Sequence, residues 1–277
     1  MTSRQVEVVP RVALSPAEFI AWHPVFRVEE LSDWYREAGR GDGRQVERLL
    51  EYYVREEKLQ LIKRGVYAQT QVFDEWLIAS RLTPDAVIGF DGALAMRGLI
   101  GEGHRVCYLT SLRTRPFCFN ETIFQPVRAN PFEGGEETME RAGLPVRITS
   151  LERTFVDCTE RLNLGPELHE LVGAFARAKE LNVDEVARLA AQRRSQLLMS
   201  RLGFCLMATG RSLPREGLRL LLRGALKRPD YFARAARRRG DRIIAKWNLI
   251  VSPEQDTMYK RGDGAATFHE YAQPRGY

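Results

Sequence analysis

The chain has 277 residues, of which 44% are hydrophobic and 28% are charged. This composition is typical of a folded protein and excludes a disordered one, and no apolar run approaches the ~20 residues needed to cross a bilayer. The N-terminal sequence MTSRQVEVVPRVAL lacks the apolar core of a secretory signal, so we expect a cytoplasmic protein without a membrane partner.

The net charge of +6 is distributed unevenly along the chain. Residues 1–70 are neutral and residues 71–187 carry −6, whereas residues 188–261 contain 18 basic and 5 acidic side chains, a net charge of +13. A field of one sign and this strength attracts polyanions. The alternative is that the basic region packs on the acidic middle of the same chain, and charge alone does not decide between the two.

The four cysteines and four histidines do not form the pattern of a metal site. No C-x-x-C pair occurs, and the histidines are scattered along the chain. Because a structural zinc site needs clustered ligands, the sequence predicts neither a metal nor a cofactor, and it predicts buried thiols.

Three short helices are predicted within the first 57 residues. The first begins at the capping-box pattern Ser15–Glu18 and ends near Pro24. The second spans Val28–Ala38, where apolar residues recur at helical spacing. The glycines of segment 39–43 then break the chain, and the third helix spans Arg44–Glu57 with the apolar face Val46, Leu49, Leu50, Tyr53 and Val54.

A hairpin follows the third helix. The β-prone runs Leu59–Ile62 and Val66–Ala68 are joined by Lys63-Arg64-Gly65. Two helices separated by a turn and followed by a basic hairpin are typical of a winged helix-turn-helix. The sequence therefore predicts a DNA-binding domain over residues 1–70.

The third helix would be the recognition helix of this domain. The N-terminal part of such a helix reaches base edges in the major groove, which selects Arg44, Gln45, Arg48 and Tyr52. Lys63 and Arg64 at the hairpin tip would contact phosphates, which position a protein without reading sequence. Four glutamates interrupt these basic residues, and winged helices also serve as protein-interaction modules, so that alternative stays open.

Three segments resemble the AbiEi-like antitoxin family. They are LQLIKRGVYA at 59–68, GFDGALAMRGL at 89–99 and ITSLERTFVD at 148–157, in the order of the family. The last of them is the most specific. The chain departs from the family at Arg97, where histidine is common, and in the basic region after residue 188.

The resemblance implies an N-terminal winged helix that binds inverted repeats in the protein's own promoter. It also implies neutralisation of a nucleotidyltransferase toxin encoded beside it, a functional link that does not require a stable complex. The partners expected from the resemblance are therefore double-stranded DNA and, indirectly, that toxin.

The middle of the chain reads as mixed helix and strand. Asp91 is expected to cap a helix over 92–97, and Thr149 and Glu152 to form a capping box. Further elements are predicted as a helix over 72–80 and strands over 86–88, 105–110, 122–127 and 145–149. In Glu152, Arg153 and Asp157 we expect a helix-surface ion pair, or an arginine that holds a strand end, rather than a catalytic group.

The last third is predicted to be mainly helical. Helices are expected from Leu168, Asn182 or Asp184, Ser195, Pro214 and Asp230, then one strand over 243–251, and a loosely ordered tail from Asp256. Arg215, Arg219 and Arg223 recur every four residues and so share one helix face. With Arg237, Arg238 and Arg239 they make a candidate polyanion-binding surface, whose alternative is solvated surface.

The sequence thus predicts an α+β protein: an N-terminal winged helix-turn-helix, then a mixed α/β domain over residues 71–255 that ends in a basic, mainly helical region, and a tail over 256–277. The predicted function is that of a DNA-binding transcriptional autorepressor and antitoxin, and not of an enzyme. The alternatives are a nuclease targeted by a winged helix and a protein-interaction module.

Overall fold

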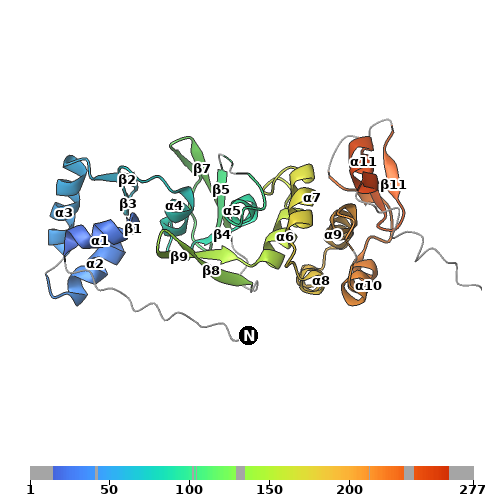
Figure 1. Cartoon of the computed structure of the whole chain (residues 1–277), viewed down its shortest axis with the longest axis horizontal. Coiled ribbons are helices and arrows are strands. Elements are labelled where there is room, and N and C mark those ends of the chain that lie inside the picture. Colours follow the sequence, from blue (N-terminus) through green and yellow to red (C-terminus); the bar gives the residue numbers. More distant parts are fainter. Residues whose placement is uncertain are drawn as a thin grey trace, which may run out of the picture. The chain divides into compact units, whose positions relative to one another are not determined.

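The computed structural model describes residues 15–40, 43–101, 103, 105–128, 135–211, 213–233 and 240–261 (Figure 1). The chain divides into two compact units. The N-terminal unit runs to Pro84 and also includes Glu140–Val146, and the C-terminal unit holds Asp85–Met139 and the chain from Arg147 onward. Among the described residues, no helix is long and apolar enough to cross a membrane.

The N-terminal unit combines helices with a small antiparallel sheet of order β1-β3-β2. Its elements in chain order are α1 Pro16–Trp22, β1 Val25–Arg27, α2 Val28–Glu37, α3 Gly43–Arg55, β2 Leu59–Lys63, β3 Val66–Gln69 and α4 Glu75–Arg81. The helices and the sheet share one core, built on Phe19, Phe26, Leu31, Val46 and Leu50. Val54, predicted on the apolar face of α3, is instead exposed, because that helix meets the core along a narrower stripe.

Local capping fixes the start of the first two helices. The Ser15 hydroxyl accepts a hydrogen bond from the Glu18 amide, as predicted, and Pro16 occupies the first helical position. At α2 the Arg27 amide donates to the Glu30 carboxylate at 2.7 Å. Strand β1, which was not predicted, lies between these helices and pairs with β3 from Val25↔Ala68 to Arg27↔Val66.

The β2–β3 hairpin ends in a tight turn of two residues, Arg64 and Gly65. Lys63, expected in the loop, pairs with Val66 instead. Gly65 has φ of +81°, a conformation that glycine adopts without strain. The Gly65 carbonyl accepts a hydrogen bond of 2.9 Å from the Val28 amide. The hairpin tip is therefore attached to the first residue of α2.

The C-terminal unit contains most of a mixed sheet of order β6-β7-β5-β4-β9-β8. Strands β5 and β7 are parallel over six residue pairs, and β4 is antiparallel to β5 and parallel to β9. The elements are β4 Val87–Ile88, α5 Phe90–Met96, β5 Arg105–Thr110, β6 Phe117–Phe119, β7 Thr122–Arg128, β8 Glu136–Arg141, β9 Leu144–Thr149 and α6 Leu151–Glu160. Strands β6 and β8 were not predicted.

The capping predictions for α5 and α6 were wrong by one or two residues. Gly89 is the cap of α5, and Asp91 lies inside the helix, where its carboxylate accepts from the Gly92 amide. Ser150 caps α6 by accepting from the Arg153 amide. Glu152 accepts instead from the Asn182 amide. Both errors arise because two capping residues stood within one turn of each other in the sequence.

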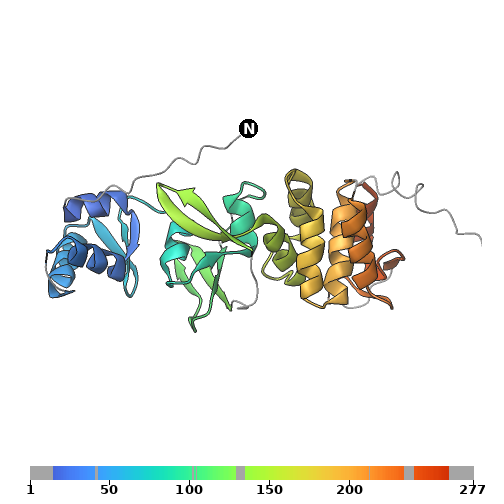
Figure 2. The same ribbon diagram turned by 90° about the horizontal axis from the view of Figure 1, so that it is seen from below.

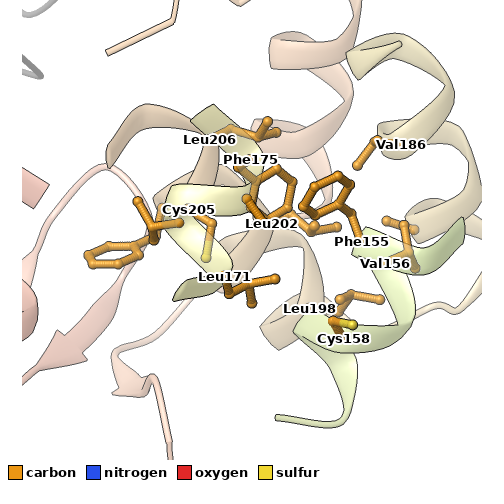
Figure 3. Close-up of a cluster of buried hydrophobic side chains, with 14 of the residues drawn as sticks. Phe155, Val156, Cys158, Leu171, Phe175, Val186, Leu198, Leu202, Cys205 and Leu206 are labelled. Atoms are coloured by element: carbon orange, nitrogen blue, oxygen red, sulfur yellow. The ribbon is translucent and has the colours of Figure 1, made fainter. Parts of the chain in front are cut away.

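Helices surround α9 in the C-terminal part of this unit (Figure 2). The elements are α7 Leu168–Arg177, α8 Val183–Gln192, α9 Gln196–Ala208 and α10 Arg215–Gly224. From Leu198 to Ala208 every residue of α9 except Arg201 is buried. A helix that is apolar on all sides must lie at the centre of its unit. Figure 3 shows Leu202 and Leu206 of α9 with Phe155 and Phe175, whose rings stack at 4.0 Å.

Beyond α10 the chain forms a second small sheet. Its strands are β10 Asp230–Tyr231, β11 Arg242–Ile244 and β12 Leu249–Val251, in the order β10-β12-β11. Asp230, expected to begin a helix, begins a strand instead, and residues 234–239 of that predicted helix lie outside the described residues. A turn at Ala245–Asn248 interrupts the predicted alternation, so Ile243 is 57% exposed while Trp247 is buried. The predicted loose tail begins as helix α11, Pro253–Arg261, in which Asp256 is buried.

Gly203 of α9 offers a direct test of this packing. A Cβ atom added there would lie 2.3 Å from the buried Trp247 ring. We expect Gly203→Ala to lower the free energy of unfolding by about 1–3 kcal/mol, as overpacking does. Gly101→Ala is the control, since no described atom lies within 4 Å of its added Cβ. Chemical denaturation of both variants tests the prediction, and equal stability would contradict it.

Candidate nucleic-acid interface

The exposed face of α3 carries its charges in two separate strips. Arg44, Gln45, Arg48, Tyr52 and Arg55 are all exposed. At about 100° per residue, they occupy one strip along the helix. The exposed Glu47 and Glu51 occupy the neighbouring strip. Residues 1–70 are therefore neutral overall, although a basic strip lies beside an acidic one on the surface of α3.

Arg55 belongs to this basic strip although sequence reasoning did not assign it to the site. Its guanidinium lies 5.7 Å from the centroid of the Tyr52 ring, a cation–π distance. The spacing in the sequence indicates the shared face, because Arg55 follows Arg48 by seven residues, or two helical turns. The strip defined by Arg44, Gln45, Arg48, Tyr52 and Arg55 is called the α3 strip below.

The two predicted hairpin residues differ in exposure. Arg64, at the turn, is exposed, whereas Lys63, the last residue of β2, is half-buried. Leu61, two residues earlier on β2, is 52% exposed. The turn is held by the bond between Gly65 and Val28, so Arg64 projects from a fixed backbone.

The basic residues of the C-terminal unit fall into an internal and an external group. Arg193 donates to Asp157, Arg201 to the carbonyls of Phe232, Thr159 and Glu160, and Arg211 to the Ala178 carbonyl. Arg193 thus pairs with an acidic residue of the middle of the chain, as the alternative expected, whereas Arg201 and Arg211 bond to backbone carbonyls. The external group comprises Arg215, Arg219 and Arg223, all exposed.

The predicted candidates Arg237, Arg238 and Arg239 lie outside the described residues. The polyanion surface predicted from sequence reduces, in the part of the chain that the structure describes, to the arginines of α10 and the adjoining Lys227 and Arg228, which are also exposed.

Arg153 and Asp157 form a buried ion cluster. Their side chains are 2% and 5% exposed, and Arg153 Nε lies 3.4 Å from Asp157 Oδ2. Arg193 Nη2 donates to Asp157 Oδ1 at 2.6 Å, and Glu136 Oε1 lies 3.6 Å from Arg153 Nη1. The predicted pairing is confirmed, but the expected surface position was wrong, because α6 buries this face under α8 and α9. The contact of Arg153 with Glu136, the first residue of β8, fits the alternative of an arginine that holds a strand end. The cluster joins α6, β8 and the end of α8.

Arg97 also has a structural position. Its guanidinium donates to the carbonyls of Ala93 and Thr149 and pairs with Glu137. It therefore links α5 to β8 and β9. The residue that departs from the AbiEi-like pattern thus serves as a bridge between three elements of the C-terminal unit.

Two cavities of this unit contain polar side chains. One, of about 480 Å³, is lined by Asp91, Arg105, Glu167 and Glu170 among others. Burial raises the pKa of Asp91, against the lowering effect of the Arg105 guanidinium that donates to it. The other, of about 930 Å³, is lined by Glu160, Arg201, Asp230 and Tyr231 among others, and burial lowers the pKa of Arg201. No group of described residues has the composition of a metal site.

The comparisons with known proteins support the fold. No protein-family model matches the chain, and no curated protein sequence matches it. Among solved structures, the chain is similar to the crystal structure of the Rv2827c protein from Mycobacterium tuberculosis, with a TM-score of 0.55 and 17% sequence identity. The match covers 87% of this chain and 92% of that one. It therefore extends over both units.

The buried cluster predicts a large effect of one substitution. Asp157→Ala leaves Arg153 without its α6 partner, and removing one member of a buried pair costs about 3–5 kcal/mol. The matched control is Glu185→Ala, which removes an ion pair with Arg188, whose side chain is 62% exposed. Exposed pairs contribute about 0–1 kcal/mol. Urea denaturation measures both, and a small loss in Asp157→Ala would refute the role of the cluster.

Proposed function

We propose that the chain is a DNA-binding transcriptional autorepressor whose N-terminal unit is a winged helix-turn-helix. The order of its elements carries the proposal: α1, β1, α2, α3, then β2 and β3 as a hairpin, with β3 in the middle of the sheet. This is the order of a winged helix, in which α3 takes the place of the recognition helix and the turn at Arg64 the place of the wing.

The α3 strip has the chemistry needed to read bases. Arginine pairs with guanine through two hydrogen bonds, and glutamine pairs with adenine in the same manner. Arg44, Gln45 and Arg48 lie within the first two turns of α3, the part of a recognition helix that reaches base edges. Within α3 the acidic Glu47 and Glu51 adjoin the strip on the side of Arg44 and Arg55, whereas Gln45 lies at its other edge.

The proposal extends to the antitoxin function through the three segments shared with AbiEi-like proteins. In the structure these segments form the β2–β3 hairpin, the α5 region and the start of α6. Their characteristic residues have structural tasks: Gly65 holds the turn, Gly98 ends α5 with φ of +68°, and Arg153 and Asp157 form the buried cluster. These tasks favour a shared scaffold over shared catalytic groups. We therefore propose neutralisation of a nucleotidyltransferase toxin without catalysis by this chain.

The DNA-binding proposal is tested by titrating the protein on its own upstream DNA and on an unrelated duplex of equal length. Arg48→Ala should lose about 1–3 kcal/mol on the upstream DNA alone, because a base contact is lost. Arg64→Ala should weaken binding to both duplexes alike, because phosphates are common to both. Gel-shift titration at one fixed salt concentration measures each affinity.

The control for this titration is Arg36→Ala. Arg36 is an exposed arginine of the same unit, but it lies on α2 and pairs with Asp33. Its removal should leave both affinities unchanged. Equal losses for Arg48→Ala on the two duplexes would reject the base-reading role of α3, and no shift by the unaltered protein would favour a protein-interaction module.

The antitoxin proposal is tested by co-producing the chain with a nucleotidyltransferase toxin encoded next to it. We expect growth to be restored without the toxin copurifying with the chain. The double variant Arg44→Ala/Arg48→Ala should lose promoter repression yet still restore growth, since both residues are exposed on the N-terminal unit. Failure of the unaltered chain to restore growth would reject the antitoxin role and leave the repressor role standing.

A further inference from the structure

Helix α10 packs against its neighbours through a face that carries Gly217, Leu221 and Gly224. A Cβ atom added to Gly217 would lie 2.7 Å from Asp184 Oδ1 of α8, and one added to Gly224 would lie 2.8 Å from Met199 Cε of α9. Leu221, between the two glycines, is fully buried. The Gly217 amide donates to Asp184 Oδ1 at 2.7 Å. This face therefore fixes both the position and the rotation of α10.

The opposite face of α10 carries three arginines, and the exposed Glu216 lies at the edge of this face. At about 100° per residue, Arg215, Arg219 and Arg223 lie roughly 160° to 240° around the helix from Gly217. All three are exposed, and successive ones are separated by a rise of about 6 Å. Lys227, also exposed, lies beyond the end of the helix at Gly224 and donates to the Arg223 carbonyl at 3.1 Å. These four residues are called the α10 ridge.

The arginines of the α10 ridge differ from the inward-facing arginines of the same unit. Within the described residues none of its three arginines forms an ion pair, whereas Arg193, Arg201 and Arg211 all bond to the chain itself. Like charges four residues apart destabilise a helix. Repulsion within the ridge therefore opposes the stability of α10, and an anion bound from outside would relieve it.

We infer that the α10 ridge binds the phosphate backbone of duplex DNA without reading its sequence. From Arg215 to Arg223 the ridge spans about 12 Å, which matches three to four phosphates at 3.4 Å of rise per strand. Single-stranded nucleic acid is bound with the help of exposed aromatic platforms, and α10 contains no aromatic residue. The choice of duplex DNA as the polyanion rests on the DNA-binding function proposed above.

The test measures how affinity depends on salt, using the full chain and a duplex unrelated to its upstream DNA. Each phosphate contact contributes about 0.9 to the slope of log affinity against log salt concentration. The variant Arg215→Gln/Arg219→Gln/Arg223→Gln should therefore lower the slope by about 2–3. The affinity ratio between upstream and unrelated DNA should stay unchanged, because phosphate contacts do not read sequence.

Two further variants make the result specific. The triple arginine-to-lysine variant at the same positions keeps the charges and should keep the slope, since lysine binds phosphate as a point charge. The control Arg36→Gln/Arg188→Gln removes two exposed arginines that pair with Asp33 and Glu185. It should leave the slope unchanged. Thermal unfolding followed by circular dichroism verifies that each variant is folded.

An unchanged slope in the folded glutamine variant overturns the inference, as does a loss confined to single-stranded RNA. The inference and the proposed function fail in distinguishable ways. Absence of any preference for upstream DNA, together with a lowered slope in the glutamine variant, would reject base reading by α3 and retain the α10 ridge.

Discussion

Helix α9 has almost no surface that can face water, and the arrangement of the C-terminal unit follows from this constraint. Burying ten of its thirteen residues requires neighbours on every side, which α6, α7, α8 and α10 supply. Trp247 lies against Gly203, where any side chain would collide with its ring. The small C-terminal sheet is therefore a part of the core and not an appendage.

Several polar groups in this core have hydrogen-bond or ion-pair partners. The Ser200 hydroxyl accepts from the Leu226 amide, and Asp157 receives Arg193 while lying beside Arg153. An unpaired charge at such depth would be expensive. This explains why Arg153 and Asp157, whose residue types also occur in catalytic sites, join secondary-structure elements in this core. It also explains why the arginines of the basic region divide into an internal group and an exposed group.

Local signals in the sequence predicted much of the secondary structure. The Ser15 cap, the Asn182 cap of α8 and the Ser195 cap of α9 all mark real helix starts, because a side chain that satisfies free amides acts within a few residues. Strand β1 was not predicted, because three residues are too few to show the two-residue alternation of a strand. The alternation from Ile243 to Val251 was misleading, because the turn at Ala245–Asn248 depends on tertiary packing of Trp247.

For the candidate interface, sequence pattern identified which residues share a helix face but not their surroundings. The four-residue spacing of Arg215, Arg219 and Arg223 was sufficient to place them together. It could not show that Arg201 and Arg211, equally basic, turn inward, because that depends on carbonyls far away in the sequence. Nor could it show that the charges of α3 are divided into strips, since net charge does not depend on rotation about a helix.

The return of the chain to the N-terminal unit at Glu140–Val146 has a consequence for how that unit can be separated from the rest. Arg141, in the returning segment, donates to Asp74 at 2.7 Å and lies 4.3 Å over the Trp76 ring. A fragment that stops at Pro84 lacks this arginine and exposes the side of α4 that it covers. The N-terminal unit is therefore discontinuous in sequence, and it can be transferred as an intact module only together with the segment from the middle of the chain.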